Sequence, residues 1–182
     1  MPMPHNPIVI DASDVIAIVS ALVSSASGAA AALVYLRQRR SAHFELARAL
    51  HSDLTSGEVA HARSILRVLV LGTPEAAARI EASDARDAYF RLLWCFERIY
   101  AGRLVLVGRS SSRKAPREGS PAWFLDEMTS WHMIYWDKTL KTAKTMIAMR
   151  LGVTSADIPD QASRKPFDEL RTELRRIGRL AD

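Results

Sequence analysis

The hydrophobic pattern begins with a run that has no charged side chain, from Val15 to Leu36. As a helix these residues would be about 33 Å long, enough to cross a hydrocarbon core of roughly 30 Å. Because Ala, Ser and Gly fill the middle of the run, a buried Ala-rich helix of a soluble bundle is the alternative. The length of the run favours a transmembrane helix over residues 15–36.

The flanks of this run predict its orientation. The preceding residues, MPMPHNPIVIDASD, hold no Lys or Arg, and the run is longer than the apolar core of a signal peptide, so we expect it to be retained. Asp11 and Asp14 precede the run, whereas Arg37, Arg39 and Arg40 follow it directly. Since cationic residues stay preferentially in the cytoplasm, we expect an external N-terminus (1–14) and a cytoplasmic domain (37–182) at the bacterial inner membrane.

Small residues recur every four positions within the run, at Ser20, Ser24, Gly28 and Ala32. Such a row lets two helix backbones approach closely in a bilayer. We therefore expect association with a second copy or with another membrane protein through this face. The alternative is that Ala and Ser are simply common in this segment.

The remaining apolar positions recur at helical spacing and predict an all-α fold, in which the transmembrane helix precedes a bundle of about four to six helices. Only LVLV at 104–107 is also compatible with a strand. We expect the anchor helix to continue over 41–54, and further helices over 55–72, 73–81, 83–102, 122–151 and 166–180, with a loop over 108–121.

Local signals set several of these boundaries. Thr55 with Glu58 three residues later has the spacing of a capping box, and Gly72 predicts the end of that helix. Pro74 suits the first position of the next helix. Gly102 predicts an end or a kink.

The apolar stripes of the expected helices predict the core. Their members are Phe44, Leu46, Ala47, Leu50 and Leu54; Tyr89, Leu92, Leu93, Phe96, Ile99 and Tyr100; Phe124, Met128, Trp131 and Tyr135; Leu140, Ala143 and Ile147; and Phe167, Leu170, Leu174 and Ile177. We expect Trp123 and Trp136 to be core residues as well, rather than platforms on which bases stack.

The order of these segments resembles a known kind of protein. One N-terminal span that ends in Arg is followed by FELARALHSDLTSGEVAHARSILRVL, by YFRLLWCFERIYAGRL and by an aromatic-rich helix with YW. This order is similar to an uncharacterised bacterial family of single-pass, membrane-anchored, all-helical proteins classified as a domain of unknown function. The resemblance covers roughly residues 15–150 and implies a single-pass anchor with a cytosolic helical domain. It implies no catalytic residue.

Charge adds a possible binding surface. The net charge is +5, and all 25 Lys and Arg residues follow residue 36. Two groups of cations stand out: Arg109, Arg113, Lys114 and Arg117 in the loop, and Lys138, Lys141 and Lys144 beside Trp136. Near a membrane such residues attract anionic lipid, and phosphates of nucleic acid attract the same side chains. We expect lipid-facing or solvated positions, because no nucleic-acid-binding motif accompanies them.

Catalytic and metal-binding patterns are incomplete. Glu58 and His61 form a single E-x-x-H, but a di-iron site requires a second pair and two further Glu residues. His43 and His51 have no nearby cysteine to complete a zinc site. Cys95 lies in the apolar run YFRLLWCF, which suits a buried thiol in a reducing compartment. We expect no cofactor and no metal, and the missing motifs favour a protein that is not an enzyme.

These observations together predict a membrane-anchored helical protein that acts by associating with another protein or with its own copies, as a scaffold, accessory or regulatory subunit. The alternative is a membrane-tethered regulator that binds nucleic acid through residues 109–117 and 138–144.

Overall fold

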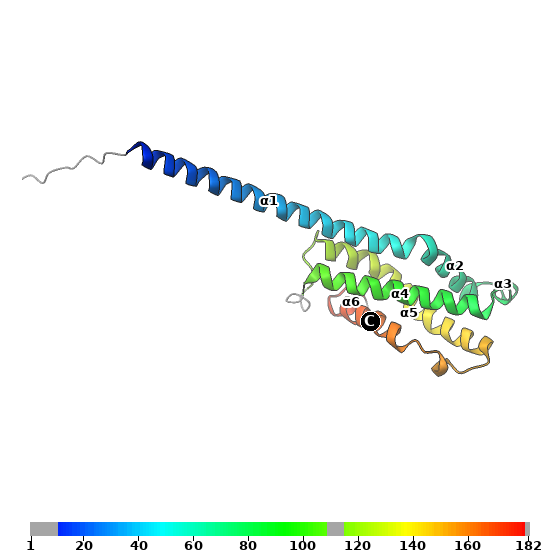
Figure 1. Cartoon of the computed structure of the whole chain (residues 1–182). Helices are drawn as coiled ribbons and strands as arrows, with labels where there is room; N and C mark the ends of the chain where they lie inside the picture. The colour runs from blue at the N-terminus through cyan, green and yellow to red at the C-terminus, as the bar shows by residue number, and fades with distance from the viewer. Residues whose placement is uncertain (1–10, 109–114, 181–182) are drawn as a thin grey trace, which may run out of the picture. The chain divides into compact units, whose positions relative to one another are not determined.

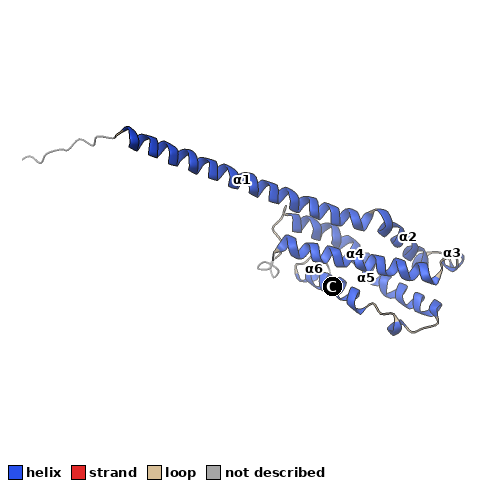
Figure 2. Ribbon diagram, viewed as in Figure 1, coloured by secondary structure: helices blue, strands red, loops and turns tan. Residues whose placement is uncertain are grey.

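The computed structural model describes residues 11–108 and 115–180. Its elements are α1 (Ala12–Thr55), α2 (Gly57–Leu71), α3 (Pro74–Ala78), α4 (Ala82–Val107), α5 (Pro121–Leu151), the 3-10 turn η1 (Ser155–Asp157) and α6 (Gln161–Arg176) (Figure 1). No strand occurs in the described ranges, and 85% of the described residues are helical (Figure 2). The all-α prediction is therefore confirmed, and LVLV at 104–107 is helical.

The chain divides into two units, Met1–Ala42 and His43–Asp182, and α1 belongs partly to each. In the first unit every described side chain is exposed. Its helix includes an 18-residue window with a mean hydropathy of 1.9, none of it buried. By length and composition, α1 is the one helix in the described part of the chain that could cross a membrane.

The second unit is a helical bundle with α4 at its centre. Helix α4, green in Figure 1, contacts α2, α5 and α6. Its apolar face follows the predicted stripe, since Tyr89, Leu92, Leu93 and Phe96 are fully buried. Phe96 meets Phe167 of α6 edge-to-face with ring centroids 4.9 Å apart. The hydrophobic core of the chain therefore lies in this unit.

Gly102 has a different role from the predicted helix end. Helix α4 continues through it to Val107, so the predicted helix end is wrong. A Cβ atom added at Gly102 would lie 2.3 Å from Cδ1 of Leu50, which is a buried residue of α1. A larger residue at Gly102 would therefore require the side chain of Leu50 to shift.

The corner between α1 and α2 also differs from the prediction. Thr55 is the last residue of α1, and its hydroxyl donates to the carbonyl of His51 at 3.0 Å instead of capping α2. Ser56 is the residue before α2, and Gly57, the first residue of α2, adopts a positive φ of 57°, which glycine tolerates. The carboxylate of Glu58 forms an ion pair with Arg91, so the predicted capping box does not form.

Other helix ends follow their local signals. Thr73 accepts a hydrogen bond from the backbone of Ala76 at 3.3 Å, with Pro74 at the first helical position as predicted. Helix α5 begins within one residue of its predicted start and ends at Gly152, which has a φ of 68°. Its hydrophobic face includes the predicted Leu140, Ala143 and Ile147.

The last helix begins five residues before the predicted boundary. Helix α6 begins at Gln161 and includes Pro166 in its second turn. A proline there removes one backbone donor, which tertiary packing tolerates. The helix ends at Arg176, before Gly178 with its φ of 74°, rather than at residue 180.

One ion pair is buried inside the bundle between α4 and α5. Nε and one terminal nitrogen of Arg103 donate to the two carboxylate oxygens of Asp126 at 2.6 and 3.0 Å. Both side chains are 1% exposed. Because each charge is removed from water, the two residues depend on each other.

Candidate binding groove

A groove of about 950 Å³ lies between α2 and α5. This volume is at the upper end of what ligand sites occupy in proteins. Its walls are formed by Ala60, Arg63, Ser64, Arg67, Val68 and Leu71 of α2, and by Trp131, His132, Tyr135 and Trp136 of α5. We call it the α2/α5 groove.

Exposed aromatic side chains form the α5 wall. Trp131 is 72% exposed and Tyr135 is 39% exposed. The prediction that Trp131 and Tyr135 belong to the core is therefore wrong. Helix α5 turns Leu125, Met133 and Trp136 toward the core instead, so the true buried stripe is shifted around the helix from the predicted one.

Trp136 joins the groove to the core. Its side chain is 1% exposed, and its ring meets the ring of Tyr135 edge-to-face at 4.8 Å. The indole Nε1 is buried and has no hydrogen-bond partner among the described residues. An indole N–H can only donate, so this atom lacks an acceptor.

The α2 wall is cationic. Arg63 is partly buried, and its guanidinium carbon lies 5.9 Å from the centre of the Trp136 ring. One terminal nitrogen donates to the carbonyl of Leu54 at 2.9 Å, while the buried Nε has no partner in the described structure. Burial lowers the pKa of Arg63. Arg67 lies one turn further along α2 and is exposed.

His132 contributes a ring that stays neutral at physiological pH. Burial, followed by the nearby charge of Arg63 and the ring of His51, lowers the pKa of His132 to about 4. The rings of His51 and His132 lie 5.9 Å apart. At pH 7 the positive charge of the groove therefore comes from its arginines.

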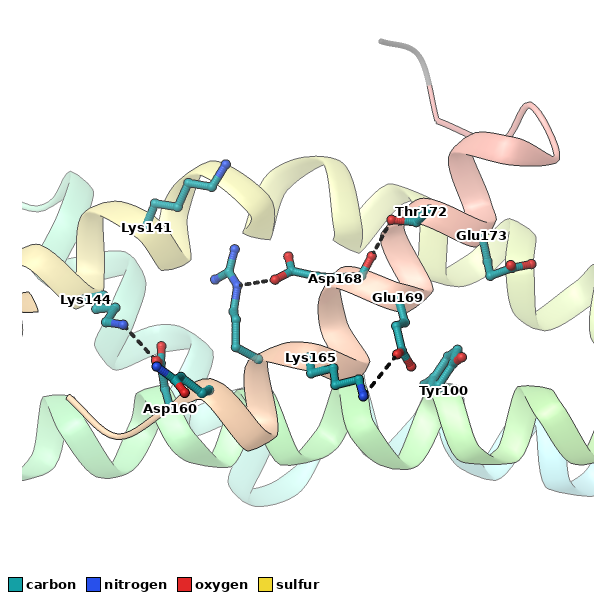
Figure 3. A pocket seen from close by; sticks show the side chains of 11 residues that line it. Tyr100, Lys141, Lys144, Asp160, Lys165, Asp168, Glu169, Thr172 and Glu173 are labelled. Carbon is teal, nitrogen blue, oxygen red and sulfur yellow. Dashed lines mark hydrogen bonds and ion pairs between the residues drawn. The ribbon is translucent and has the colours of Figure 1, made fainter. Parts of the chain in front are cut away.

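A second groove, of about 800 Å³, lies between α4, α5 and α6 (Figure 3). It is lined by charged side chains, and these are paired with one another. Lys144 contacts Asp160 at 2.7 Å, and Lys165 contacts Glu169 at 3.9 Å, as Figure 3 shows. Its cations therefore face carboxylates of the same chain, which reduces its attraction for an anionic ligand.

Asp160 organises one end of this second groove. It is 3% exposed, and it accepts hydrogen bonds from the hydroxyl of Tyr89 at 2.5 Å and from Lys144 at 2.7 Å. Burial alone would raise the pKa of Asp160, but the hydrogen bonds from Lys144 and Tyr89 outweigh it and lower the pKa. This network ties α4 and α5 to the start of α6, which is a structural task.

The predicted basic surface is only partly described. Arg109, Arg113 and Lys114 lie outside the described residues, and Arg117 is exposed. Lys138 is exposed on α5, and Lys141 lies 3.7 Å from Asp137. Lys141 and Lys144 share the second groove, where acidic residues accompany them.

The residues considered for catalysis or metal binding do not assemble a site. No group of three or more His, Cys, Asp or Glu residues that could hold a metal ion occurs in the described ranges. Glu58 and His61 line a small cavity of about 230 Å³, and Glu58 pairs with Arg91. Cys95 is buried as predicted, and burial raises its pKa to about 11, so its thiol stays protonated.

The predicted association row lies on α1 within the first unit. Ser20, Ser24, Gly28 and Ala32 are exposed, and a Cβ added at Gly28 would meet no atom within 4 Å. Arg37, Arg39 and Arg40 follow on the same helix, and all three are exposed.

No protein-family model, curated protein or solved structure matches this chain. The resemblance to a bacterial membrane-anchored family therefore stays a prediction.

Sequence reasoning missed most of the α2/α5 groove, although two signals were present. Arg63 and Arg67 are four residues apart on one helix, and so are Trp131 and Tyr135 on another. This spacing places each pair on one helix face. The sequence does not reveal that the two faces meet, because the contact joins residues that are far apart in the chain.

Proposed function

We propose that this protein is a single-pass bacterial inner-membrane protein whose helical domain faces the cytoplasm and binds another protein through the α2/α5 groove. It acts by association, as a scaffold, accessory or regulatory subunit, and its action requires no cofactor. The lipid bilayer is its first partner, and the small-residue row of α1 offers a second route of association within the membrane.

The observation that carries the proposal is the exposed Trp131 on the wall of a groove that also holds Tyr135 and two arginines. Trp, Tyr and Arg are the residues most enriched where proteins bind one another. Covering a large, exposed aromatic side chain with a partner is favourable, because it removes apolar surface from water. Trp131 therefore has the character of an interface residue rather than a core residue.

The membrane assignment is supported by the apolar stretch of α1 and by its flanks. The exposed apolar side chains of the first unit would be covered by lipid. Three arginines follow the stretch, whereas acidic Asp11 and Asp14 precede it. A reporter fused after Asp182 should behave as cytoplasmic. An external reporter would contradict the proposed orientation.

The groove is tested by photo-cross-linking in intact membranes. We expect a benzophenone amino acid at Ser64, an exposed lining residue, to form adducts with a specific protein. The control position is Arg86 on α4, which is half-exposed and does not line the groove. Adducts at Arg86 but not at Ser64 would move the interface away from the groove.

The nucleic-acid alternative uses the loop and the Lys138–Lys144 face. No described contact favours it, because Lys141 and Lys144 face carboxylates. Its distinguishing property would be an affinity that falls steeply with salt as counterions are released.

A further inference from the structure

Two buried donors in the α2/α5 groove lack acceptors. One is the Nε1 of Trp136, a side chain that is 1% exposed, and the other is the Nε of Arg63. Indole and guanidinium groups donate hydrogen bonds and cannot accept them. Both atoms are closed off from water in the structure, so a ligand reaches them only when the neighbouring side chains move aside. A ligand that does so must bring acceptor atoms.

The surrounding charge narrows the kind of acceptor. Arg63 and Arg67 lie one turn apart on α2, and no acidic residue belongs to the described lining of this groove. In the second groove, by contrast, Asp160 and Glu169 face the lysines. A positive wall with donors but without its own carboxylates favours an anionic acceptor, and a planar carboxylate matches the fork of an arginine.

The opposite wall indicates what accompanies the anion. Trp131 and Tyr135 expose ring surface, and Leu71 at the end of α2 is 64% exposed. The groove has a volume of about 950 Å³, and a single carboxylate would leave most of this apolar surface uncovered. The shape and the lining suit a chain segment better than a small isolated anion.

We propose that the α2/α5 groove recognises a segment of another protein in which a glutamate or aspartate stands between apolar or aromatic residues. The carboxylate accepts hydrogen bonds from Trp136 and Arg63, Arg67 adds attraction, and the flanking apolar side chains cover Trp131 and Tyr135. This inference rests on the proposed function and adds the chemistry of the partner.

The test uses the full chain in lipid nanodiscs, with the indole N–H signals of its four tryptophans observed by NMR. The probe is an acetylated, amidated tetrapeptide of leucine, glutamate, phenylalanine and leucine, and its control carries glutamine in place of glutamate. We expect the Trp136 signal to move on addition of the glutamate peptide, which should bind roughly tenfold more tightly than its glutamine control. The signal of Trp94 should stay fixed, because its Nε1 already donates to Ser163 at 3.1 Å outside the groove.

Two variants in the groove and one control outside it make the result specific. Trp136→Phe assigns the signal and should weaken binding of the glutamate peptide, but it removes a buried side chain and can perturb folding. Arg67→Glu changes an exposed residue and should reduce the affinity at least tenfold without altering the helix content. Arg86→Glu, outside the groove, should leave binding within twofold of the parent chain.

Several outcomes would overturn the inference. Equal binding of the two peptides would mean that the groove does not recognise the carboxylate. A response to phenylacetate but to neither peptide would assign the groove to a small acid, and displacement of the peptide by single-stranded oligothymidylate would assign it to nucleic acid. Adducts at Ser64 together with equal peptide binding would leave the proposed function intact while contradicting its acidic chemistry.

Discussion

The first unit, up to Ala42, and the bundle from His43 onward differ in the burial of their apolar side chains. In the bundle, Leu54, Leu92 and Phe167 are fully buried by neighbouring helices. In the first unit, Leu22 and Leu33 are more than half exposed on a helix with a mean hydropathy of 1.9 over 18 residues. One region covers its apolar side chains with its own chain, whereas the apolar side chains of the other are exposed.

Polar groups show the same difference between the two regions. In the bundle, the buried charges of Arg103 and Asp126 are paired between two different helices, α4 and α5. In the first unit, the hydroxyl of Ser25 donates to the carbonyl of Ala21 at 2.8 Å within its own helix. A helix that satisfies its polar groups locally can enter lipid without a partner, whereas the bundle depends on tertiary contacts.

The largest expected effect separates the two regions through the buried ion pair. Arg103→Met should leave the carboxyl of Asp126 buried without its partner, and should lower the free energy of unfolding of the bundle by about 3–5 kcal/mol. The full chain should remain in the membrane fraction, because α1 is unchanged. Chemical denaturation monitored by tryptophan fluorescence measures the first quantity, and fractionation measures the second.

A matched control uses an exposed ion pair. Arg176 lies 2.6 Å from Glu173 near the end of α6, and its side chain is 37% exposed. Arg176→Met should cost no more than about 1 kcal/mol, since water already solvates that pair. Equal losses for both variants would show that burial of Arg103 does not govern its contribution.

How much of this could be predicted from sequence differs between helices and contacts. Periodicity located every long helix, and it identified Tyr89, Leu92 and Phe96 as core because those apolar residues recur at helical spacing. It misplaced Trp131, because the aromatic stripe of α5 and its buried stripe lie on neighbouring faces of the same helix. Aromatic residues at helical spacing do not by themselves distinguish a core from an interface.

The contacts between helices could not be predicted from the sequence. Tyr89 and Asp160 are 71 residues apart, and Arg103 could have paired with any of many carboxylates. The pattern also assigned Gly102 to a helix end, since it cannot show that Leu50 packs there. The α2/α5 groove depends on such a pairing. The sequence therefore indicated the exposed face of each helix but not that the two faces meet.

A smaller effect tests the polar surroundings of the bundle through pH. The lowered pKa of His132, about 4 against an ordinary value of 6.5, means that the folded state favours the neutral ring. Stability should therefore be complete above pH 6.5 and should fall as the pH drops from 6.5 toward 4. Because His132 is only half-buried, solvent screening reduces the expected loss to roughly 1 kcal/mol.

The measurement compares the free energy of unfolding at pH 7 and pH 4.5 for the parent chain and for His132→Gln. The variant should show a smaller decrease, because it has no imidazole to protonate beside Arg63 and His51. The lower pH of the comparison, 4.5, avoids protonation of Asp160 in the folded chain. The pKa of Asp160 is lowered from its ordinary value of 3.8, so the folded chain protonates this carboxylate only below pH 3.8. Identical pH profiles for the two proteins would assign the acid sensitivity to other groups.

The smallest effect on the bundle is expected from a change in the first unit, at Gly28. Gly28→Leu places a branched side chain in the row of Ser20, Ser24 and Ala32, where close approach of a second helix requires a small residue. Within the chain the new side chain meets open space, because an added Cβ has no atom within 4 Å. The stability of the bundle should therefore not change. Insertion should not suffer either, because Leu is more favourable than Gly in a bilayer core.

A transmembrane association assay should nevertheless report weaker pairing for Gly28→Leu, whereas Val23→Leu, off the row, should pair as the parent does. If Gly28→Leu pairs as strongly as the parent chain, the small residues reflect composition, and association must depend on the bundle and its groove.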